Sequence, residues 1–439
     1  MEVVIIIPNV ILRERRGAEV ASTRIFAPRG TQDGLPGEIR MKRFVESVFM
    51  QHCQCYGYSE AHTPVFEYSR LFERGVGSVT DIVEKELYTF TDKHGNRLAL
   101  RPEGTANLTR AVLQHDMMKE LPLKLCYKIT CYRQEAPEEG RLREFHQIGA
   151  ECYGSALPQA DAEVITLAYT ALRAIGINNL TLNLNSLGCN DCRTGYINAL
   201  IRYLLPHANN GDLCPTCISR MGRNPLRVMD CKNPSCREVA KKAPKILDFL
   251  CDDCREHFDA VKQGLDAVGI KYNEKNHLIR GLDYYNRTVF EFKAGEGGAN
   301  GTVCGGGRYD GLSGRLGGAA VPAVGFAIGE ERAIIAMREC GMEEIPAEKP
   351  LVYVASADPS QAGRGAARLR GLNVYAERDL MGLDMARQLA AAKESGARWL
   401  VIIEENELIL KNNETGDKVS MAKDAWDDAA RMIKSRRKR

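Results

Sequence analysis

Arginine and carboxamide or carboxylate side chains concentrate in the segment YRQEAPEEGRLREFHQIGAECYG, in the first half of the chain. Arg133 and Arg141 carry rigid guanidinium groups, which bind phosphate oxygens in pairs, whereas a lysine acts as a point charge. Gln147, Gly149 and Glu151 follow at alternate positions, so in a strand they share one face. The spacing predicts phosphate chemistry beside a polar recognition surface.

Two predicted strands flank this charged segment and would position it. Residues 123–130 form an apolar run after Pro122, and residues 145–153 alternate between apolar and polar side chains. Pro137 and Gly140 lie between them, which predicts a long charged loop that joins the strands. The alternative is a surface hairpin with solvated arginines, which is the correct interpretation of most charge clusters.

A second candidate site follows the sequence RPEGT. Glu103 and Thr105 lie on a loop that opens a predicted helix at 106–114, in which we expect Asn107 and Thr109 to be exposed. A carboxylate and a hydroxyl on a well-ordered loop suit the binding of an α-ammonium group. The alternative is a helix N-terminal cap with Glu103 as a first-turn charge.

Two later segments add a cation, phenols and glycines. Arg280 precedes Tyr284 and Tyr285 in HLIRGLDYYNRTVFEF, which predicts a turn followed by a strand at 288–292. An arginine there could stabilise charge that develops on a phosphate, and the tyrosines could supply hydroxyl partners and aromatic walls. The segment CGGGRYDGL lets backbone approach a ligand closely. It lacks the Gly-Lys-Ser/Thr of a Walker loop and the dinucleotide-binding fingerprint.

The composition is that of an ordinary globular chain with several domains. Apolar residues make up 44% and charged residues 27% of 439 positions, and a typical domain length of about 100 to 200 residues predicts two to four domains. The 60 basic and 57 acidic residues give a net charge of only +3. Binding of a nucleic acid must therefore come from local patches.

The N-terminus and the cysteine count indicate the compartment. MEVVIIIPNVIL is too short to span a membrane, and it carries Glu2 where a secretory signal would be positive. We interpret residues 1–22 as a loosely attached extension. Fifteen cysteines without a secretory signal favour a reducing cytoplasm, so we expect a cytoplasmic protein without a membrane part.

Cysteines dominate the segment from residue 188 to residue 270. Eight of the fifteen lie there in four pairs: Cys189/Cys192, Cys214/Cys217, Cys231/Cys236 and Cys251/Cys254. Short helices are predicted at 194–205, 245–251 and 256–268. Such pairs are what tetrahedral zinc–thiolate sites require, and one or two structural zinc ions would let this segment fold with little core. The other interpretation is a helical insertion without metal. No histidine or open carboxylate accompanies the pairs, which argues against catalytic zinc.

The C-terminal part has a different pattern. After a linker at 343–350, predicted strands at 351–355, 373–376 and 399–403 alternate with predicted helices at 361–369, 382–397 and 423–434. Alternating strands and helices predict a small, mainly parallel sheet that helices cover. The terminal KSRRKR could contact phosphate, but we favour a frayed tail.

Together these segments resemble class II aminoacyl-tRNA synthetases of the histidyl type over about residues 26–439. Residues 133–151 are similar to motif 2, residues 59–67 with Pro64 to motif 1, residues 322–332 to motif 3, and RGLDYY to a histidine-specific signature. The resemblance implies an α+β fold. It comprises an antiparallel-sheet catalytic domain at 23–340 with a helical Cys-rich insertion at 188–270, and an α/β anticodon-binding domain at 349–439.

The resemblance also implies an activity and a set of site residues. The implied reaction attaches L-histidine to tRNA(His) through a histidyl-adenylate, with ATP and Mg²⁺, in a homodimer. The implied histidine pocket consists of Glu103, Gly104, Thr105, Gln147, Glu151, Tyr284, Tyr285 and Tyr309. The implied ATP site consists of Arg133, Arg141, Arg280 and Arg332, of which Arg133 and Arg280 are the catalytic pair.

Two other functions are consistent with the same fold. One is the synthetase-like regulatory subunit of ATP phosphoribosyltransferase, which usually lacks the C-terminal domain and has eroded motifs. The other is a synthetase for threonine or proline, against which RGLDYY and Glu151 argue. EENELILKNNETGDKVSM departs from the usual Gly-Glu-x-Glu-Leu form of the family, so the contacts to an anticodon stay open.

Overall fold

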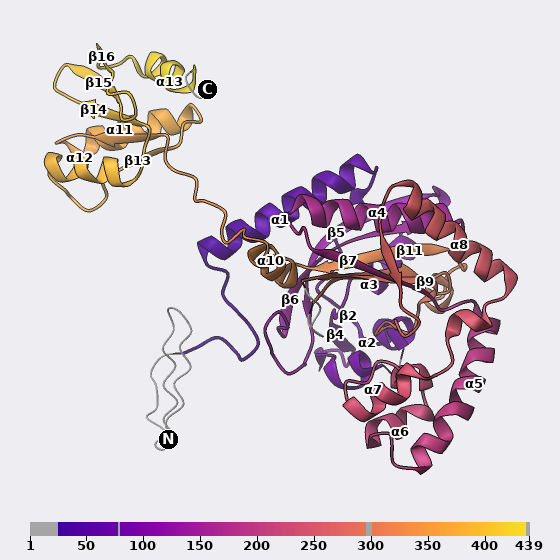
Figure 1. Cartoon of the computed structure of the whole chain (residues 1–439). Coiled ribbons are helices and arrows are strands. Elements are labelled where there is room, and N and C mark those ends of the chain that lie inside the picture. The colour runs from indigo at the N-terminus through magenta and orange to yellow at the C-terminus, as the bar shows by residue number, and fades with distance from the viewer. Residues whose placement is uncertain (1–24, 78–79, 296–300, 436–439) are drawn as a thin grey trace, which may run out of the picture. The chain divides into compact units, whose positions relative to one another are not determined.

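The chain divides into two compact units in the computed structural model, Met1–Ile345 and Pro346–Arg439 (Figure 1). The structure describes residues 25–77, 80–295 and 301–435. The predicted extension at 1–22 and the last four residues of the KSRRKR tail lie outside this described part. Within it, none of the helices combines the length and the apolar character that crossing a bilayer requires.

A large sheet of eight strands forms the centre of the first unit, in the order β1-β5-β6-β11-β10-β9-β7-β8. In chain order the strands are β1 (Ser59–Glu60), β5 (Leu123–Tyr132), β6 (Glu144–Tyr153), β7 (Leu180–Ser186), β8 (Tyr272–Glu274), β9 (Asn286–Ala294), β10 (Thr302–Arg308) and β11 (Ala323–Gly329). The two short edge strands pair in parallel, and all pairings between them are antiparallel. The predicted α+β class is thereby confirmed.

Helices cover one face of this sheet (Figure 1). They are α1 (Pro36–Cys55), α4 (Pro158–Ala174), α8 (Asp252–Ala267) and α10 (Glu330–Glu339). Alternate strand residues such as Ile148 on β6 and Phe326 on β11 point into this layer, where Phe49 of α1 contacts the Phe326 ring edge-on at 6.1 Å. Helix α8 falls within the predicted insertion, but its apolar residues Phe258, Val261 and Leu265 pack with this core.

The opposite face of the large sheet lies beside a small three-stranded sheet and helix α3 (Thr105–Gln114). The small sheet has the order β2-β4-β3 and consists of β2 (Phe66–Tyr68), β3 (Thr89–Thr91) and β4 (Arg97–Leu100). The prediction that Asn107 and Thr109 of α3 are exposed is wrong, because both are fully buried. The Thr109 hydroxyl donates to the Thr105 carbonyl at 2.8 Å, and the Asn107 amide N–H donates to Glu67 at 3.3 Å, so both side chains have an internal hydrogen-bond partner.

Between β7 and α8, the cysteine-rich segment folds as three helices with short 3-10 turns. The helices are α5 (Asn190–Asn209), α6 (Pro215–Met221) and α7 (Pro234–Lys241), of which α6 and α7 were not predicted. Leu200 and Leu204 of α5 pack with Leu226, Val228 and Val239 in an apolar cluster. This cluster continues into the face of the large sheet opposite α1, so the insertion has more core than the sequence indicates.

The second unit contains a five-stranded sheet with the order β13-β12-β14-β15-β16. Its elements are β12 (Val352–Ala355), α11 (Pro359–Gly371), β13 (Ala376–Arg378), α12 (Met385–Glu394), β14 (Trp399–Ile403), β15 (Glu407–Asn412), β16 (Lys418–Ala422) and α13 (Trp426–Ser435). A mainly parallel sheet was predicted, but two pairings are parallel and two antiparallel. The difference arises because EENELILKNNETGDKVSM, in which no strand was predicted, forms a hairpin in which Leu408 and Leu410 are buried.

Candidate functional site

Glycines on the large sheet make room for charged side chains on its face opposite α1. Gly325 of β11 lies opposite Glu151 of β6, and a β-carbon at Gly325 would overlap with the Glu151 carboxylate. A β-carbon at Gly305 of β10 would likewise overlap with the guanidinium of Arg280. The glycines of β10 and β11 therefore let side chains lie directly against the strand backbone. These side chains are the Glu151 carboxylate and the Arg280 guanidinium.

Glu151 is the centre of a buried hydrogen-bond network. Its Oε1 accepts from the hydroxyls of Thr105 at 2.7 Å and Tyr127 at 3.2 Å, and its Oε2 accepts from Tyr309 at 2.5 Å. The side chain is fully buried, and this burial raises its pKa to about 8 although the three hydroxyls favour the carboxylate. Because three hydroxyl groups converge on this carboxyl group, its oxygens are held in place before any ligand binds.

Glu103 is a second buried carboxylate in the same region. Its oxygens accept the backbone N–H groups of Thr105 at 2.7 Å and Ala106 at 2.8 Å, so it caps α3, and the Tyr284 hydroxyl donates to it at 3.3 Å. Burial raises its pKa, whereas these backbone donors and the charge of Arg133 oppose the shift. The helix-capping role, which was the alternative to ligand binding for Glu103, is thus present. The same carboxylate also accepts a hydrogen bond from Tyr284.

Three tyrosine rings form an aromatic wall next to the two carboxylates. The ring centroids of Tyr284 and Tyr285 are 4.7 Å apart, and those of Tyr284 and Tyr309 are 5.5 Å apart. All three side chains are at most 5% exposed. RGLDYY and Tyr309 of the glycine-rich segment CGGGRYDGL are distant along the chain but contribute to one pocket wall.

Gly104 and Gln147 complete the predicted histidine set. A β-carbon at Gly104 would lie 2.6 Å from the Tyr127 ring, so this glycine lets the start of α3 approach β5. Gln147 lies on β6 on the same strand face as Glu151, is half-buried, and accepts from the Cys131 thiol at 3.4 Å. All eight predicted histidine-pocket residues are thus brought to one region.

Two of the three arginines of the β5–β6 hairpin, Arg133 and Arg141, belong to the predicted ATP site, and both are only partly buried. Arg133 donates from Nε to the Pro102 carbonyl at 3.0 Å, and its guanidinium carbon lies 5.1 Å from the centroid of Phe145. Arg141 lies in the loop, where its Nε is 3.2 Å from Glu138. The stacked arginine has one defined orientation, whereas the loop arginine is held by a surface carboxylate.

Arg332 at the start of α10 lies against the same loop. It donates to the carbonyls of Gly140 at 3.1 Å and Thr302 at 2.9 Å. Burial, followed by the positive charge of Arg141 and, more weakly, of Arg133, lowers its pKa. Three of the four predicted ATP-site arginines are therefore electrostatic neighbours.

Arg280 reaches this group through one carboxylate. Its Nη1 is 3.5 Å from Oε2 of Glu291, which also accepts from the Thr302 hydroxyl at 3.0 Å. Because the Thr302 carbonyl binds Arg332, Glu291 and Thr302 together connect the two arginines. Nε of Arg280 is buried without a hydrogen-bond partner among the described residues. The guanidinium is therefore only partly paired in the chain.

Sequence reasoning missed two site residues, Tyr127 and Glu291. Tyr127 alternates along β5 with Cys131 and Arg133, so period 2 from Arg133 could have found it. Glu291 is the one acidic residue of the apolar strand TVFEF. A carboxylate in a buried strand needs a partner, and that requirement was the available signal.

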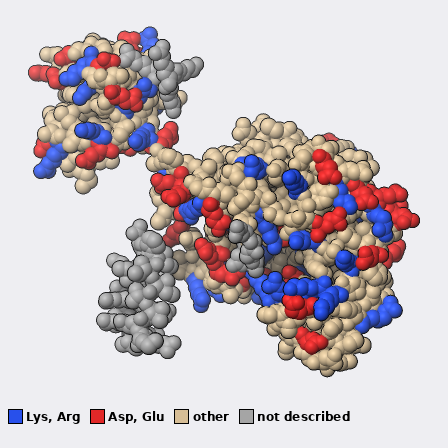
Figure 2. All heavy atoms as spheres, viewed as in Figure 1, with Lys and Arg blue, Asp and Glu red and all other residues tan. Residues whose placement is uncertain are grey.

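Basic side chains gather around a recess on the displayed face of the first unit (Figure 2). The predicted net charge of +3 does not reveal this local arrangement. A local gathering of Lys and Arg is the electrostatic feature that a polyanionic ligand requires.

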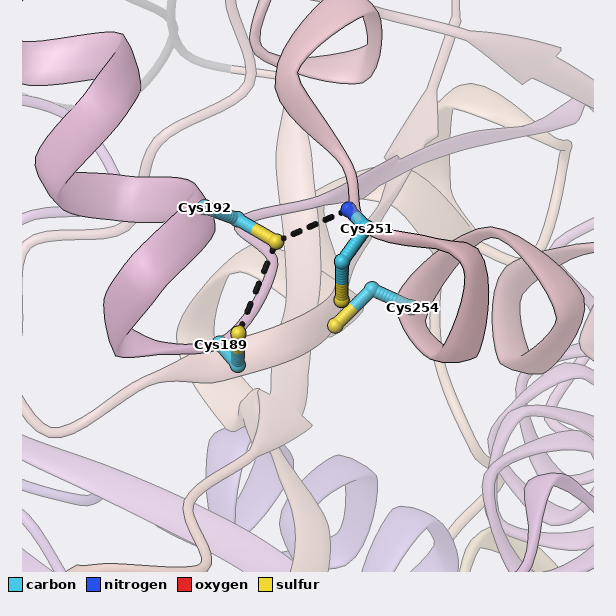
Figure 3. Close-up of side chains that lie close together, drawn as sticks. All are labelled: Cys189, Cys192, Cys251 and Cys254. Carbon is cyan, nitrogen blue, oxygen red and sulfur yellow. Dashed lines mark hydrogen bonds between the residues drawn. The ribbon is translucent and has the colours of Figure 1, made fainter.

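The eight paired cysteines form two groups outside this site. Cys189, Cys192, Cys251 and Cys254 form one, and Cys214, Cys217, Cys231 and Cys236 form the other. Within each group all sulfur atoms lie within 4.8 Å of one another, and the first group is shown in Figure 3. Each group could hold a metal ion.

Comparisons with known proteins agree with this geometry. A family model described as histidyl-tRNA synthetase matches residues 30–191 and 236–332. The chain is 42% identical to the histidine–tRNA ligase of Acetivibrio thermocellus, over 92% of this chain and 99% of that one. It is 45% identical to the histidine–tRNA ligase of Desulforudis audaxviator, over 88% and 92%.

A solved structure shows the same architecture. The crystal structure of apo S. aureus histidyl-tRNA synthetase superposes with a TM-score of 0.76 at 31% identity, and the match covers 94% of this chain and 99% of that one. The sequence matches and the structural match each cover nearly the whole of both chains, so the similarity extends beyond the catalytic fold. The chain belongs to the histidyl-tRNA synthetase family.

Proposed function

We propose that this chain activates L-histidine with ATP and transfers it to the 3′ end of tRNA(His). In the first step the histidine carboxylate attacks the α-phosphorus, which gives histidyl-adenylate and releases pyrophosphate. In the second step the terminal tRNA ribose attacks the activated carbonyl and AMP leaves. No side chain acts as a nucleophile, so catalysis depends on positioning and on charge stabilisation.

The observation that carries this proposal is the Glu151 network beside the arginines. We assign to Glu151 and Tyr309 the hydrogen bonds to the two nitrogens of the imidazole ring, and to Tyr284 and Tyr285 its aromatic walls. An amino acid without these nitrogens would bury the pocket's polar groups without making the hydrogen bonds that the imidazole makes, and each lost hydrogen bond costs about 1–3 kcal/mol. This cost accounts for selection of histidine over threonine or proline.

The amine of the substrate would lie at the other end of the pocket. We assign its binding to Glu103 and Thr105, with Gly104 and Gln147 shaping the same wall. Glu103 already accepts two backbone N–H groups, yet a carboxylate has about four lone-pair sites, so it can accept an ammonium proton as well.

ATP would occupy the arginine-lined part of the site. We assign the α-phosphate to Arg133 and Arg280, and the outer phosphates to Arg141 and Arg332. Forked guanidinium groups match phosphate oxygens, and a charge that develops at the α-phosphorus is stabilised from two sides. Each of the four is only partly exposed, and none has a fully buried carboxylate as a fixed partner.

Mg²⁺ belongs to this chemistry because it accompanies ATP. A hard cation takes oxygen ligands, and Glu291 supplies a carboxylate beside Arg280, so the residues present fit the ion. When bound, Mg²⁺ neutralises phosphate charge and orients the pyrophosphate leaving group.

Membership of the family also suggests an oligomeric state, a location and a role for each domain, which we add to the proposal. We propose a cytoplasmic homodimer in which residues 23–340 form the catalytic domain, residues 188–270 its insertion and residues 349–439 the anticodon-binding domain. The second unit, residues 346–439, folds around its own core of Val352, Val401 and Leu410, which is consistent with a separate binding module.

Pyrophosphate exchange tests the function. We expect the purified chain to exchange labelled pyrophosphate into ATP only when histidine is present, not with threonine or proline. It should also charge a tRNA(His) transcript. Exchange with another amino acid would overturn the assignment of histidine. The absence of any exchange would favour a regulatory protein that has the synthetase fold.

A further inference from the structure

The first cysteine group lies between the start of α5, the first helix of the insertion, and the start of α8, which packs against the large sheet. Cys189 directly precedes α5 and Cys192 lies in its first turn, while Cys251 directly precedes α8 and Cys254 lies in its first turn. Figure 3 shows the four thiols directed toward one another from these two helix starts. The Sγ atoms of Cys189 and Cys192 are 3.5 Å apart, and the Cys251 backbone N–H donates to Cys192 Sγ at 3.1 Å.

The second group has the same construction within the insertion. Cys214 directly precedes α6 and Cys217 lies in its first turn, while Cys231 precedes α7 and Cys236 lies in the first turn of that helix. The Sγ atoms of Cys214 and Cys231 are 3.9 Å apart, and the Cys214 backbone N–H donates to Cys236 Sγ at 3.2 Å. Two groups distant along the chain thus have the same local arrangement.

The chemistry of the donors selects the metal. Zinc–sulfur bonds of about 2.3 Å in a tetrahedron place the sulfurs about 3.8 Å apart, and the separations of 3.5 Å for Cys189–Cys192 and 3.9 Å for Cys214–Cys231 lie on either side of that value. All fifteen cysteines are free, so none of the eight is used in a disulfide. We propose that each group binds one structural Zn²⁺ ion through four thiolates. Four protein ligands leave no open position, so neither ion would take part in the reaction.

Packing around the first group shows what its ion would contribute. Among the described residues, its apolar surroundings are a small cluster that contains Cys192, Leu250 and Cys254, with Leu247 alongside. The rest of α5 and of α8 packs into the two larger apolar cores, so this small cluster is what lies at the two helix starts themselves. Metal–thiolate bonds would add to the free energy that holds the two starts together.

Zinc would also affect the active site, because the insertion contacts the loop that carries Arg280. Arg193, next to Cys192, donates to the Tyr285 carbonyl at 3.3 Å. Asn224, between the cysteines of the second group, donates to Asp283 at 2.9 Å. The zinc ions would therefore hold the support of the RGLDYY loop in place without touching the substrates.

Metal analysis of the purified, untagged chain tests this proposal. We expect two zinc ions per chain after dialysis, one in Cys254→Ser, one in Cys217→Ser and none in the double variant. Cys53→Ser is the matched control, because Cys53 is as fully buried as Cys217 but belongs to neither group, and it should keep two. Eight reactive thiols without metal, or single variants that still bind two ions, would overturn the proposal.

A second measurement applies even when a variant does not fold. Wild-type protein expressed with cobalt should carry two Co²⁺ ions and show the sulfur-to-metal charge-transfer and visible bands of tetrahedral cobalt–thiolate sites. Bands of octahedral cobalt would exclude the proposed ligand sets. Bound iron with sulfide would assign the same cysteines to iron–sulfur clusters and would overturn the assignment of zinc.

Discussion

The two ends of the proposed site differ in how completely the chain itself satisfies them. At the histidine end, Glu151 and Tyr309 are at most 1% exposed and are hydrogen-bonded to each other. At the phosphate end, Arg133, Arg141 and Arg332 are partly exposed and bind backbone carbonyls or a surface carboxylate. The first end is organised before substrate arrives, whereas the second must exchange partners when ATP binds.

This difference has an energetic consequence. A buried polar network is strengthened by low dielectric, and the loss of one member leaves the others unpaired. Exposed ion pairs contribute only about 0–1 kcal/mol, so a ligand can displace them at little cost. Substitutions at the histidine end should therefore have larger effects and act mainly on histidine, while substitutions in the loop should act mainly on ATP.

The largest effect is expected for Glu151→Gln. The glutamine amide has only one acceptor oxygen, so it cannot accept from all three hydroxyls and an imidazole N–H as the carboxylate can. We therefore expect kcat/KM for histidine in pyrophosphate exchange to fall by about 10³-fold, with little change in the KM for ATP. Glu330→Gln is the control, because Glu330 is also fully buried and burial likewise raises its pKa to about 8. Equal losses in the two variants would mean that the network has no special role.

Arg280→Ala should have the next largest effect. Loss of one charge that stabilises the transition state should lower the exchange rate by about 10²–10³-fold with a modest change in histidine affinity. Lys293→Ala is the matched control, because Lys293 is the other cation near Glu291, at 3.4 Å, and it has no proposed contact with ATP. An unchanged exchange rate in the Arg280 variant would refute its catalytic role.

A smaller effect is expected for Arg141→Ala in the loop. The KM for ATP should rise about tenfold, because a partly exposed phosphate contact is screened by solvent, and the KM for histidine should stay the same. Glu138→Gln should act in the opposite direction, since it removes the carboxylate that lies 3.2 Å from Arg141. A change in histidine KM in either variant would contradict the separation of the two ends.

The last expected effect is a pH dependence of stability rather than of activity. The pKa of Glu151 is about 8 in the folded chain against 4.5 for the free group, so between these values the folded chain keeps a proton that the unfolded chain loses. Its contribution to stability is therefore present below about pH 4.5 and is lost as pH rises through about 8. In urea unfolding, the free energy of unfolding of Glu151→Gln should fall less steeply between pH 4.5 and about 8 than that of the wild type. The same pH profile in both proteins would contradict the raised pKa of Glu151.

Local features of the site could be predicted well from residue types. The boundaries of β5 and β6 agree with the predicted strands to within a few residues, because strand alternation, Pro137 and Gly140 are local signals. Asn107 and Thr109 were misplaced for the same reason. Their polarity suggests exposure, and only the packing of α3 against Tyr153 and Glu67 supplies partners that make burial favourable.

The amino-acid sequence by itself determined which chemical groups this protein has, in which order, and on which kinds of element, since periodicity and turn residues act over a few positions. Tertiary structure decided which of those groups meet. It joined Glu151 to Tyr309 and Thr105, and it combined four cysteine pairs into two groups from several arrangements that spacing alone allows. Contacts between residues far apart along the chain depend on how strands pair and helices pack, and no local pattern encodes that choice.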